Sequence, residues 1–401
     1  MDNTDVLISG ASVAGPALAH WLRAHGFNPT VVERAPAPRE GGYGVDVRGA
    51  AVDVVERMGV LAQVRGSGID MRGITYVDGS NRPLAEISTE QFDGRGNGRD
   101  LEIMRGALSR ILHDATADGV EYVFGDSVTG LEPDDDGVLV TFEHTAPRRF
   151  HLVIGADGLH SQVRALAFGA ESRFRRHLGH HISIFSVGGH LAADRWTLLH
   201  NVPGKLAGVH ASDGELGATA ILGFASGEIP FDHRDTGQQK RILREAFTGV
   251  GWEVPRLLEE MEHAPDFYFD SVSQIHLDRW SRGRVALVGD AGYCPSPLSG
   301  QGTSLALVGA YVLAGELRAA GGDHRTAFAR YEDRMREYVR QNQKIAESGA
   351  EVLMPASRTR IWLRNQVMRF MSRFPALGRL SGGIQRAANA IELPDYGAGR
   401  P

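Results

Sequence analysis

The apolar residues nearest the N-terminus follow the pattern of a strand, a turn, a helix and a second strand. Asp5 to Ser9 (DVLIS) is a short apolar run, and a turn bounded by Gly10 and Gly15 follows it. Ala17 to His25 carries apolar residues at helical spacing, and Thr30 to Glu33 is again a β-type run. The first 33 residues therefore predict one strand–turn–helix–strand unit.

Two later apolar runs have the character of strands in the same sheet. Residues 151–155 (HLVIG) and 284–289 (RVALVG) are rich in Val, Ile and Leu, and each ends in glycine with an aspartate close behind. Continuous runs of this kind are typical of parallel strands that are buried on both faces. We therefore predict that these two runs and 5–9 share one α/β sheet.

The middle of the chain has a different pattern, in which apolar and polar residues alternate. Alternating stretches at 182–187, 196–200 and 218–222 are separated by Gly, Pro and Asp turns, which indicates an antiparallel sheet inserted into the α/β part. The acidic run 133–137 is expected to be a solvated turn between strands. Beyond residue 303 the spacing predicts helices at 304–320, at 326–349 and from 357 onward.

Composition and charge exclude several classes of protein. The 401 residues are 42% hydrophobic and 23% charged, which suits a two-domain globular chain. The formal net charge of −6 argues against a nucleic-acid partner, because phosphate binding needs a basic surface. Cys294 is the only cysteine, so no intramolecular disulfide can form. With no secretory signal and no membrane span in the sequence, we expect a cytoplasmic location.

The first glycine turn has the features of a dinucleotide-binding site. Gly10 and Gly15 bracket a turn that leads into a helix N-terminus, where unpaired N–H groups and a partial positive charge attract a pyrophosphate. Ser12 stands where the usual motif has its middle glycine, and it can donate a hydrogen bond to phosphate. Glu33 ends the second strand, where a carboxylate accepts hydrogen bonds from ribose hydroxyls and repels a 2′-phosphate. FAD or NAD is therefore favoured over NADP at this turn.

Three motifs in a fixed order carry a family resemblance. They are Gly10–Gly15 with Glu33, then Gly155-Ala-Asp-Gly158, then Gly289–Gly302 (GDAGYCPSPLSGQG). In these motifs the chain resembles the class A flavoprotein monooxygenases, the family of para-hydroxybenzoate hydroxylase, phenol hydroxylases and the tetracycline- and polyketide-modifying hydroxylases. It departs from the family pattern at Tyr293, which replaces a histidine, and at Thr303-Ser304, where the family has an asparagine.

The resemblance implies an α/β fold with a Rossmann-like FAD-binding domain, an inserted and mainly antiparallel substrate domain, and C-terminal helices. We predict that the FAD-binding domain is discontinuous and occupies 1–72, 98–175 and 276–320. The substrate domain is expected at 73–97 and 176–275, and a helical segment at 321–401.

The resemblance also assigns roles to single residues. Asp290 would bind the ribityl chain, and the loop that begins at Pro297 would wrap the isoalloxazine ring. Arg105 would reach the pyrophosphate and ribityl region, with a helix-surface arginine as the alternative. Asp157 would support FAD and the approach of the nicotinamide, or else cap the following helix. The full set of predicted FAD contacts is Gly10, Ser12, Val13, Ala14, Gly15, Glu33, Arg34, Arg48, Arg105, Val128, Asp157, Asp290, Pro297, Gly300, Gln301, Gly302 and Thr303.

Other residues that could form a metal or catalytic site are better explained by a structural role. His177, His180 and His181 lie close together, but no carboxylate is near them, and we expect a solvated bend at the start of a strand rather than a metal site. Cys294 is expected to be a small buried residue and not a nucleophile. No Gly-x-Ser-x-Gly sequence at a strand end supports a hydrolase. No metal is therefore expected.

The C-terminal stretch from Ser357 to Ala390 is basic and amphipathic. It carries seven arginines and no acidic residue, and its apolar residues fall on one helical face: Leu363, Val367, Phe370, Met371 and Phe374. Such a helix can lie on a membrane. We favour the alternative that it packs across the substrate domain or a second subunit. Pro375 is expected to end or kink this helix.

The resemblance implies an FAD-dependent monooxygenase. NADPH or NADH would reduce the flavin transiently, O₂ would form a C4a-hydroperoxyflavin, and one oxygen atom would enter an aromatic or polyketide-like small molecule. Asp46, Arg48 and Pro297 are candidates for groups beside the flavin, and Phe185, Trp196, His210 and Phe224 are candidate pocket walls or plain core. A monomer or homodimer is expected. A halogenase or reductase of the same fold, or an FAD-binding protein without turnover, remains an alternative.

Overall fold

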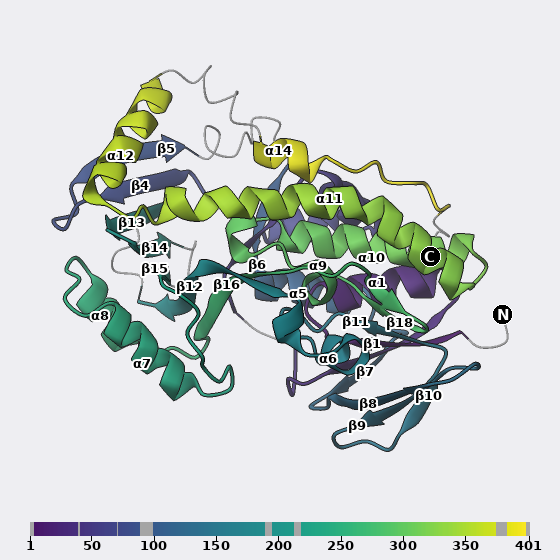
Figure 1. Cartoon of the computed structure of the whole chain (residues 1–401). Coiled ribbons are helices and arrows are strands. Elements are labelled where there is room, and N and C mark those ends of the chain that lie inside the picture. Colours follow the sequence, from purple (N-terminus) through teal and green to yellow (C-terminus); the bar gives the residue numbers. More distant parts are fainter. Residues whose placement is uncertain are drawn as a thin grey trace.

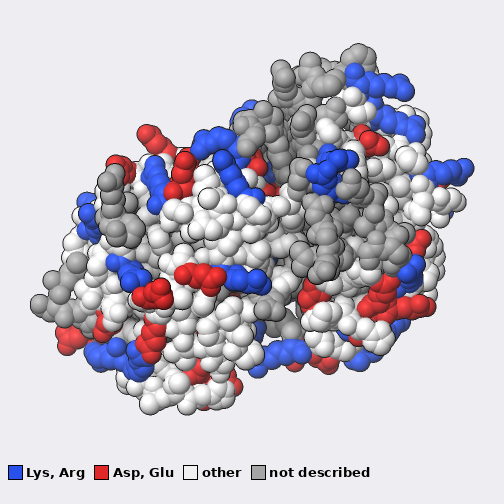
Figure 2. Space-filling view, turned by 180° about the vertical axis from the view of Figure 1, so that it is seen from behind, with Lys and Arg blue, Asp and Glu red and all other residues white. Residues whose placement is uncertain are grey.

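The computed structural model describes residues 4–38, 41–69, 71–88, 99–188, 195–211, 218–373 and 383–397. Figure 1 shows two parts side by side, with the N-terminal strands at the right and a second sheet at the left, and long C-terminal helices running across both. On the opposite face of the molecule, basic and acidic side chains are interspersed (Figure 2). Within the described residues, no helix combines the length and the apolar character needed to span a membrane.

A six-stranded sheet forms the base of the first part. Its strands are parallel except for the pair β17–β18. The strand order is β17 (Ser281–Arg282), β18 (Val285–Leu287), β11 (Leu152–Gly155), β1 (Asp5–Ser9), β2 (Asn28–Glu33), β7 (Glu121–Phe124). The prediction that three apolar runs far apart in the sequence share one sheet is confirmed, because β1 lies directly beside β11 and β11 beside β18.

The two faces of this sheet are covered by different elements. Helices α1 (Ala14–Ala24), α10 (Gly302–Ala319) and α11 (His324–Leu353) cover one face. The other face meets helix α6 (Gln162–Phe168) and a three-stranded antiparallel sheet of β8 (Val128–Pro133), β9 (Val138–Phe142) and β10 (Arg148–Phe150). The predicted acidic turn 133–137 lies between β8 and β9.

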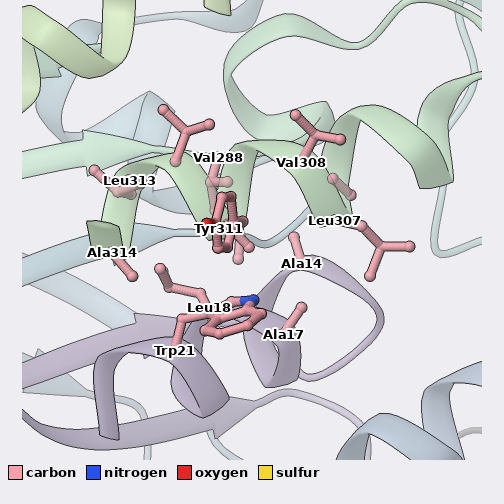
Figure 3. Close-up of a cluster of buried hydrophobic side chains, with 14 of the residues drawn as sticks. Ala14, Ala17, Leu18, Trp21, Val288, Leu307, Val308, Tyr311, Leu313 and Ala314 are labelled. Atoms are coloured by element: carbon pink, nitrogen blue, oxygen red, sulfur yellow. The ribbon is translucent and has the colours of Figure 1, made fainter. Parts of the chain in front are cut away.

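The helical face holds the largest hydrophobic core. Figure 3 shows Leu18 and Trp21 of α1 facing Leu307 and Tyr311 of α10, with Val288 behind them. The rings of Trp21 and Tyr311 meet edge to face, with centroids 4.9 Å apart, a geometry that aromatic pairs prefer. Because α1 begins at the glycine turn and α10 begins just after the second glycine loop, this core fixes the two loops relative to each other.

A seven-stranded sheet forms the second part. It is mainly antiparallel, as predicted, with one parallel pair between β13 and β4. The order is β16 (Tyr268–Ile275), β12 (Arg175–Val187), β15 (Ala218–Ala225), β14 (Lys205–Ala211), β13 (Trp196–Val202), β4 (Gly73–Val77), β5 (Pro83–Ser88). Helices α7 (Thr236–Ala246) and α8 (Val254–Met261) cover one face of this sheet.

The remaining elements connect the two parts. Helix α11 is longer than predicted and packs against α10, against β12 and against α14, and α12 (Arg358–Arg373) packs against β5 and β13. Pro375 lies outside the described residues. The other elements are β3 (Gly44–Val47), α2 (Ala50–Arg57), α3 (Leu61–Gly66), β6 (Leu101–Met104), α5 (Arg105–Asp114), η2 (Glu171–Arg173), α9 (Asp290–Tyr293), η5 (Pro297–Ser299) and α14 (Gly383–Ala388).

Candidate flavin site

The glycine turn before α1 has no room for a side chain at either of its two glycines. Gly10 has φ +108°, and a Cβ on it would lie 2.5 Å from the carbonyl oxygen of Ala156. A Cβ on Gly15 would lie 1.8 Å from the carbonyl oxygen of Gly10. Both glycines are therefore required for the close fold of the turn, and the turn presents the N-terminus of α1 to whatever lies above it.

Glu33 lies at the end of β2, beside this turn. Its carboxylate accepts hydrogen bonds from the backbone N–H of Ala11 at 2.8 Å and of Ala35 at 2.9 Å. These bonds hold the carboxylate at the edge of the turn, where the ribose of a dinucleotide would lie. The backbone N–H of Asp126 donates to the carbonyl of Glu33, so the segment that leads into β8 runs alongside. The side chain of Val128 is buried in the core under this segment, and that of Arg34 is exposed.

Arg105 begins α5 and reaches across to the glycine turn. Its Nη2 donates to Ser12 Oγ at 3.0 Å, and its Nη1 donates to Tyr43 OH at 3.4 Å. Tyr43 is the main cause of the raised pKa of Arg105, and Asp290 adds to it. The structure thus brings together four side chains from segments far apart in the sequence, and the alternative of a helix-surface arginine is wrong.

Ser109, which the sequence reasoning missed, fastens the same turn. Its Oγ donates to the carbonyls of Ser12 at 3.1 Å and Ala11 at 3.3 Å. A signal existed, because Ser109 lies four residues after Arg105 and therefore on the same side of a helix. Tyr43 was also missed, since nothing in the sequence pairs it with Arg105.

Asp157 holds the loop between β11 and α6. One oxygen accepts from Ser161 Oγ, and the other accepts from the backbone N–H of Val163 at 3.1 Å and from Ser9 Oγ at 3.4 Å. Burial raises the pKa of Asp157, and these hydrogen bonds oppose that shift. Ser161 itself is the N-cap of α6. The observed contacts therefore hold the loop, as the resemblance implied, and also order the start of α6, as in the capping alternative.

The second glycine loop runs from α9 through η5 to α10. Asp290 opens α9; burial raises its pKa, and Arg105 counteracts this. Ser296 has φ +84°, a strained conformation for a residue with a side chain, and Gly300 has φ +62°. Gln301 is fully buried, yet neither its Nε2 nor its Oε1 has a hydrogen-bond partner within the described part of the chain. Because buried amides are almost always satisfied, an amide in this position is suited to hydrogen-bond a polar ligand.

The strand β3 lies against this loop and brings two further predicted residues to it. Arg48 Nη2 is 2.9 Å from Asp46 Oδ2. The backbone N–H of Arg48 donates to Ser304 Oγ at 3.1 Å, and a Cβ on Gly300 would lie 3.4 Å from Asp46 Oδ2. These contacts place the 41–48 segment beside the second glycine loop. Ser304, the departure from the family asparagine, fastens the two segments.

Cys294, which precedes the loop, is buried, as predicted. Its thiol lies 3.8 Å from the carbonyl oxygen of Ser273, and burial raises its pKa well above the usual range. A thiol in this state is not nucleophilic.

One face of the seven-stranded sheet looks toward these loops. Residues directly opposite each other on neighbouring strands share a face. Strand register aligns Thr197, His210, Thr219 and Ser186 in one row across four strands. Tyr268 lies on the same face through its pairing with Ile184, and its ring centroid is 5.9 Å from that of Tyr43. The row therefore lies on the face that meets the 41–48 segment.

Of the four predicted pocket walls, only His210 lies on this face. Phe185 and Phe224 are packed in the hydrophobic cluster with α7 and α8, so they are core. Trp196 precedes Thr197 in β13, so its side chain points to the other face of the sheet, the face of Phe185 and Phe224. There it covers Gly73 of the neighbouring strand. The assignment of these three residues to the pocket is wrong, because alternation defines two faces but does not say which one meets the flavin.

His210 is held in a defined orientation. It is buried, its Nδ1 is 3.0 Å from Thr197 Oγ1, and burial lowers its pKa, so it is neutral near pH 7. Its Nε2 is buried and has no hydrogen-bond partner among the described residues.

The histidines at 177, 180 and 181 do not form the solvated bend that we expected. They lie within β12, next to a bulge between His177 and His181. His181 is fully buried and stacks on Phe224 and Phe269, and burial, followed by His177, lowers its pKa to about 4. Across the described residues, no three His, Cys, Asp or Glu side chains are placed to share a metal ion.

These features fit FAD. A turn with no room for a Cβ at Gly10 and Gly15 suits a pyrophosphate, Glu33 suits an unphosphorylated ribose, and Gln301 has two buried amide atoms for a ring or its ribityl chain. Residues 3–187 match the family model described as FAD binding domain. The chain is 41% identical over 394 residues to a flavin-dependent monooxygenase from an unknown prokaryotic organism, an alignment that covers 98% of each chain.

The chain belongs to the flavin-dependent monooxygenases. It is also 50% identical over 339 residues to an uncharacterized protein of Mycobacterium tuberculosis, which covers 84% of this chain and 91% of that one. Among solved structures, tetracycline destructase Tet(55) aligns with a TM-score of 0.84 at 40% identity, over 98% of this chain and 99% of the other. The protein is therefore an FAD-dependent enzyme of the class A flavin monooxygenase type, as the sequence motifs implied.

Proposed function

We propose that this monooxygenase acts on a polycyclic, oxygen-rich aromatic compound of the polyketide type, with NADPH or NADH as reductant. The overall reaction would consume substrate, O₂, one NAD(P)H and one proton, and would release hydroxylated substrate, water and NAD(P)⁺. The whole-length similarity to tetracycline destructase Tet(55), at 40% identity, supports this class of substrate. The hydroxyl and carbonyl groups of such compounds could form hydrogen bonds with the row of Thr197, His210, Thr219 and Ser186 on the sheet face that looks toward the glycine loops.

The observation that carries the proposal is His210 together with Thr197. A neutral histidine with one ring nitrogen fixed by Thr197 and the other buried without a partner is set to exchange one hydrogen bond with a phenolic or enolic oxygen. Binding such an oxygen would satisfy Nε2, whereas an apolar ligand would leave it unpaired at a cost of about 1–3 kcal/mol. The site therefore selects against substrates without oxygen at this position.

When bound, FAD supplies the redox chemistry by accepting hydride from NAD(P)H and passing one oxygen atom from O₂ to the substrate. The residues of this chain bind and orient. Glu33, Ser12 and Arg105 surround the nucleotide end, whereas Asp46, Arg48 and Gln301 border the ring end. All of these roles are proposals for individual residues.

The test is substrate-stimulated turnover. Holoenzyme is mixed with NADPH or NADH and with tetracyclines, anthraquinones or simple phenols. The consumption of NAD(P)H and O₂ is measured, and the masses of the products are determined by mass spectrometry. We expect stimulation and a product heavier by one oxygen atom with a polycyclic compound. Stimulation by simple phenols alone, or no stimulation by any compound, would contradict the proposal.

A variant connects this result to the sheet face. His210→Ala is expected to raise KM for the active compound about tenfold, the cost of one lost hydrogen bond in a buried site, with unchanged FAD content. His144→Ala is the matched control, because His144 is exposed. Equal KM values for the two variants would remove His210 from the substrate site.

A further inference from the structure

Helix α12 exposes an unusual number of large apolar side chains. In the described part of the chain, four of the exposed large hydrophobic residues lie on this one helix, and only Leu166 and Val352 lie elsewhere. The four are Trp362, Leu363, Val367 and Phe370, with exposures of 60, 55, 49 and 55%. Single exposed apolar residues are common, but four neighbours on one helix face indicate an interaction surface.

These residues lie on the side of the helix that faces away from the protein. At roughly 100° per residue, Trp362, Leu363, Val367 and Phe370 occupy one side, opposite to the buried Asn365 and Met368. The packed side is firmly attached, because Arg364 stacks over the ring of Tyr76 at 3.8 Å and donates to Asn201 at 2.9 Å. The helix therefore packs across the second sheet, as the sequence predicted, but its apolar residues lie on the opposite side and are exposed.

Arginines border the apolar side on both edges. The same rotation places Arg358, Arg369 and Arg373 next to Trp362, and Arg360 next to Val367. All four are exposed, and α12 contains no acidic residue although the whole chain has a net charge of −6. The corner of the molecule that holds α12 shows mainly basic side chains when viewed from behind (Figure 2). An apolar face bordered by arginines, three on one edge and one on the other, is the arrangement of helices that lie in the headgroup region of a bilayer.

A cavity on the Trp362 edge fits the same partner. It has a volume of about 380 Å³ and lies between α12 and the ends of β5 and β13. Arg358, Trp362, Gln366 and Arg369 line it from the helix, and Leu84 and Asn201 from the sheet. Two guanidinium groups and an amide beside an indole ring suit a phosphate headgroup next to the acyl region.

We propose that α12 is a docking helix for an anionic phospholipid surface. Trp362, Leu363, Val367 and Phe370 enter the boundary between headgroups and acyl chains, and the bordering arginines bind lipid phosphates. The inference does not depend on the identity of the substrate. The apolar residues alone would also suit a second copy of the chain, but the arginine borders favour a surface dense in negative charge.

Vesicle flotation of the purified holoenzyme tests this proposal. Neutral phosphatidylcholine vesicles are compared with vesicles containing about one third phosphatidylglycerol, at low salt and at about 0.5 M NaCl. We expect the enzyme to float with the anionic vesicles at low salt, and much less with neutral vesicles or at high salt. No flotation, or equal flotation with both lipids, would overturn the assignment.

Two pairs of variants assign the binding to α12. Trp362→Ser with Phe370→Ser is expected to weaken partitioning at least about tenfold, whereas Leu166→Ser, an exposed apolar position on α6, leaves it unchanged. Arg358→Gln with Arg369→Gln is expected to weaken it roughly 30-fold, whereas Arg110→Gln with Arg325→Gln removes the same charge elsewhere and has a small effect. FAD content verifies that each variant is folded.

Light scattering distinguishes a lipid surface from a second copy of the chain as the partner of α12. If the wild-type enzyme is a dimer that Trp362→Ser with Phe370→Ser converts to a monomer, α12 is a subunit interface and the lipid proposal is wrong. A wild type and variant of the same mass, together with flotation on anionic vesicles, support it.

Discussion

The turn before α1 leaves no space for a side chain at Gly15. A Cβ there would lie 1.8 Å from the carbonyl oxygen of Gly10, which is backbone and can move only if the whole turn moves. We predict that Gly15→Ala weakens FAD binding about 10- to 100-fold, because overpacking of a tight site costs about 1–3 kcal/mol. Flavin fluorescence titration of the apoprotein measures the change.

The control for this variant is Gly66→Ala at the end of α3, where a Cβ meets nothing within 4 Å. That variant is expected to bind FAD normally and to be as stable as the wild type or slightly more stable. If Gly15→Ala bound FAD as well as Gly66→Ala does, the turn would not be the pyrophosphate site.

Residues whose roles depend on local spacing could be predicted from the sequence. Gly10, Gly15 and Glu33 belong to one strand–turn–helix–strand unit, so their separation along the chain fixes their separation in space. Tyr43 was not predicted, because its contact with Arg105 depends on how distant segments pack, whereas the helical spacing of Ser109 from Arg105 was a signal that we did not use. The unsatisfied amide of Gln301 is likewise visible only when its surroundings are known.

At the scale of elements, periodicity identified the strands but not the orientation of the inserted sheet. Alternation in 182–187 and 218–222 correctly separated two sets of side chains. Which set faces the flavin is decided by α7 and α8, which bury Phe185 and Phe224 and so leave the His210 side for the site. For α12 the sequence correctly predicted a helix that packs across the substrate domain, but it did not show that the apolar stripe is the exposed side.

The attachment of α12 to the sheet depends on Arg364. Its guanidinium stacks on Tyr76, donates to Asn201 and Asn365, and donates to the carbonyl of Val352 at 3.0 Å. Arg364→Ala removes all of these contacts and leaves the amide oxygen of the buried Asn365 without its donor, so we predict a loss of about 2–3 kcal/mol in the docking of the helix.

Hydrogen exchange measured by mass spectrometry reports this loss. Peptides from 358–373 should exchange about 30- to 100-fold faster in Arg364→Ala, whereas peptides from α10 stay protected. Arg360→Ala is the matched control on the same helix, because Arg360 is exposed. Unchanged protection of 358–373 in Arg364→Ala would show that the helix is held mainly by Met368 and its apolar neighbours.

At the scale of the whole molecule, a cluster of charged residues joins the two parts. His160 lies in the loop between β11 and α6, and its Nδ1 is 3.0 Å from Glu171 Oε1. Its Nε2 is 2.9 Å from Asp270 Oδ2 on β16 of the other sheet. Carboxylates only accept hydrogen bonds, so both ring nitrogens must carry protons and the ring must be an imidazolium. Arg164 and Arg175 contact the same Glu171, and the ring of His233 stacks on His160 at 3.8 Å.

This cluster predicts a loss of stability at alkaline pH. Burial by itself would lower the pKa of His160, but the hydrogen bonds to Asp270 and Glu171 outweigh it and raise the pKa to about 9. A folded-state pKa above the unfolded value of about 6.5 stabilises the fold fully below pH 6.5, and this contribution is lost as the pH rises through about 9. The upper limit of the contribution is about 3.5 kcal/mol, because each pKa unit corresponds to about 1.4 kcal/mol.

His160→Gln isolates this contribution, since glutamine cannot titrate. Urea unfolding at saturating FAD is measured for both proteins at about pH 6.5 and pH 9.5. We expect the free energy of unfolding to fall more steeply with pH in the wild type, so that the gap between the two proteins narrows at the higher pH. His144→Gln, at an exposed site, should follow the wild type. If His160→Gln showed the wild-type pH dependence, the imidazolium would not be the group that binds the FAD-binding part to the inserted sheet.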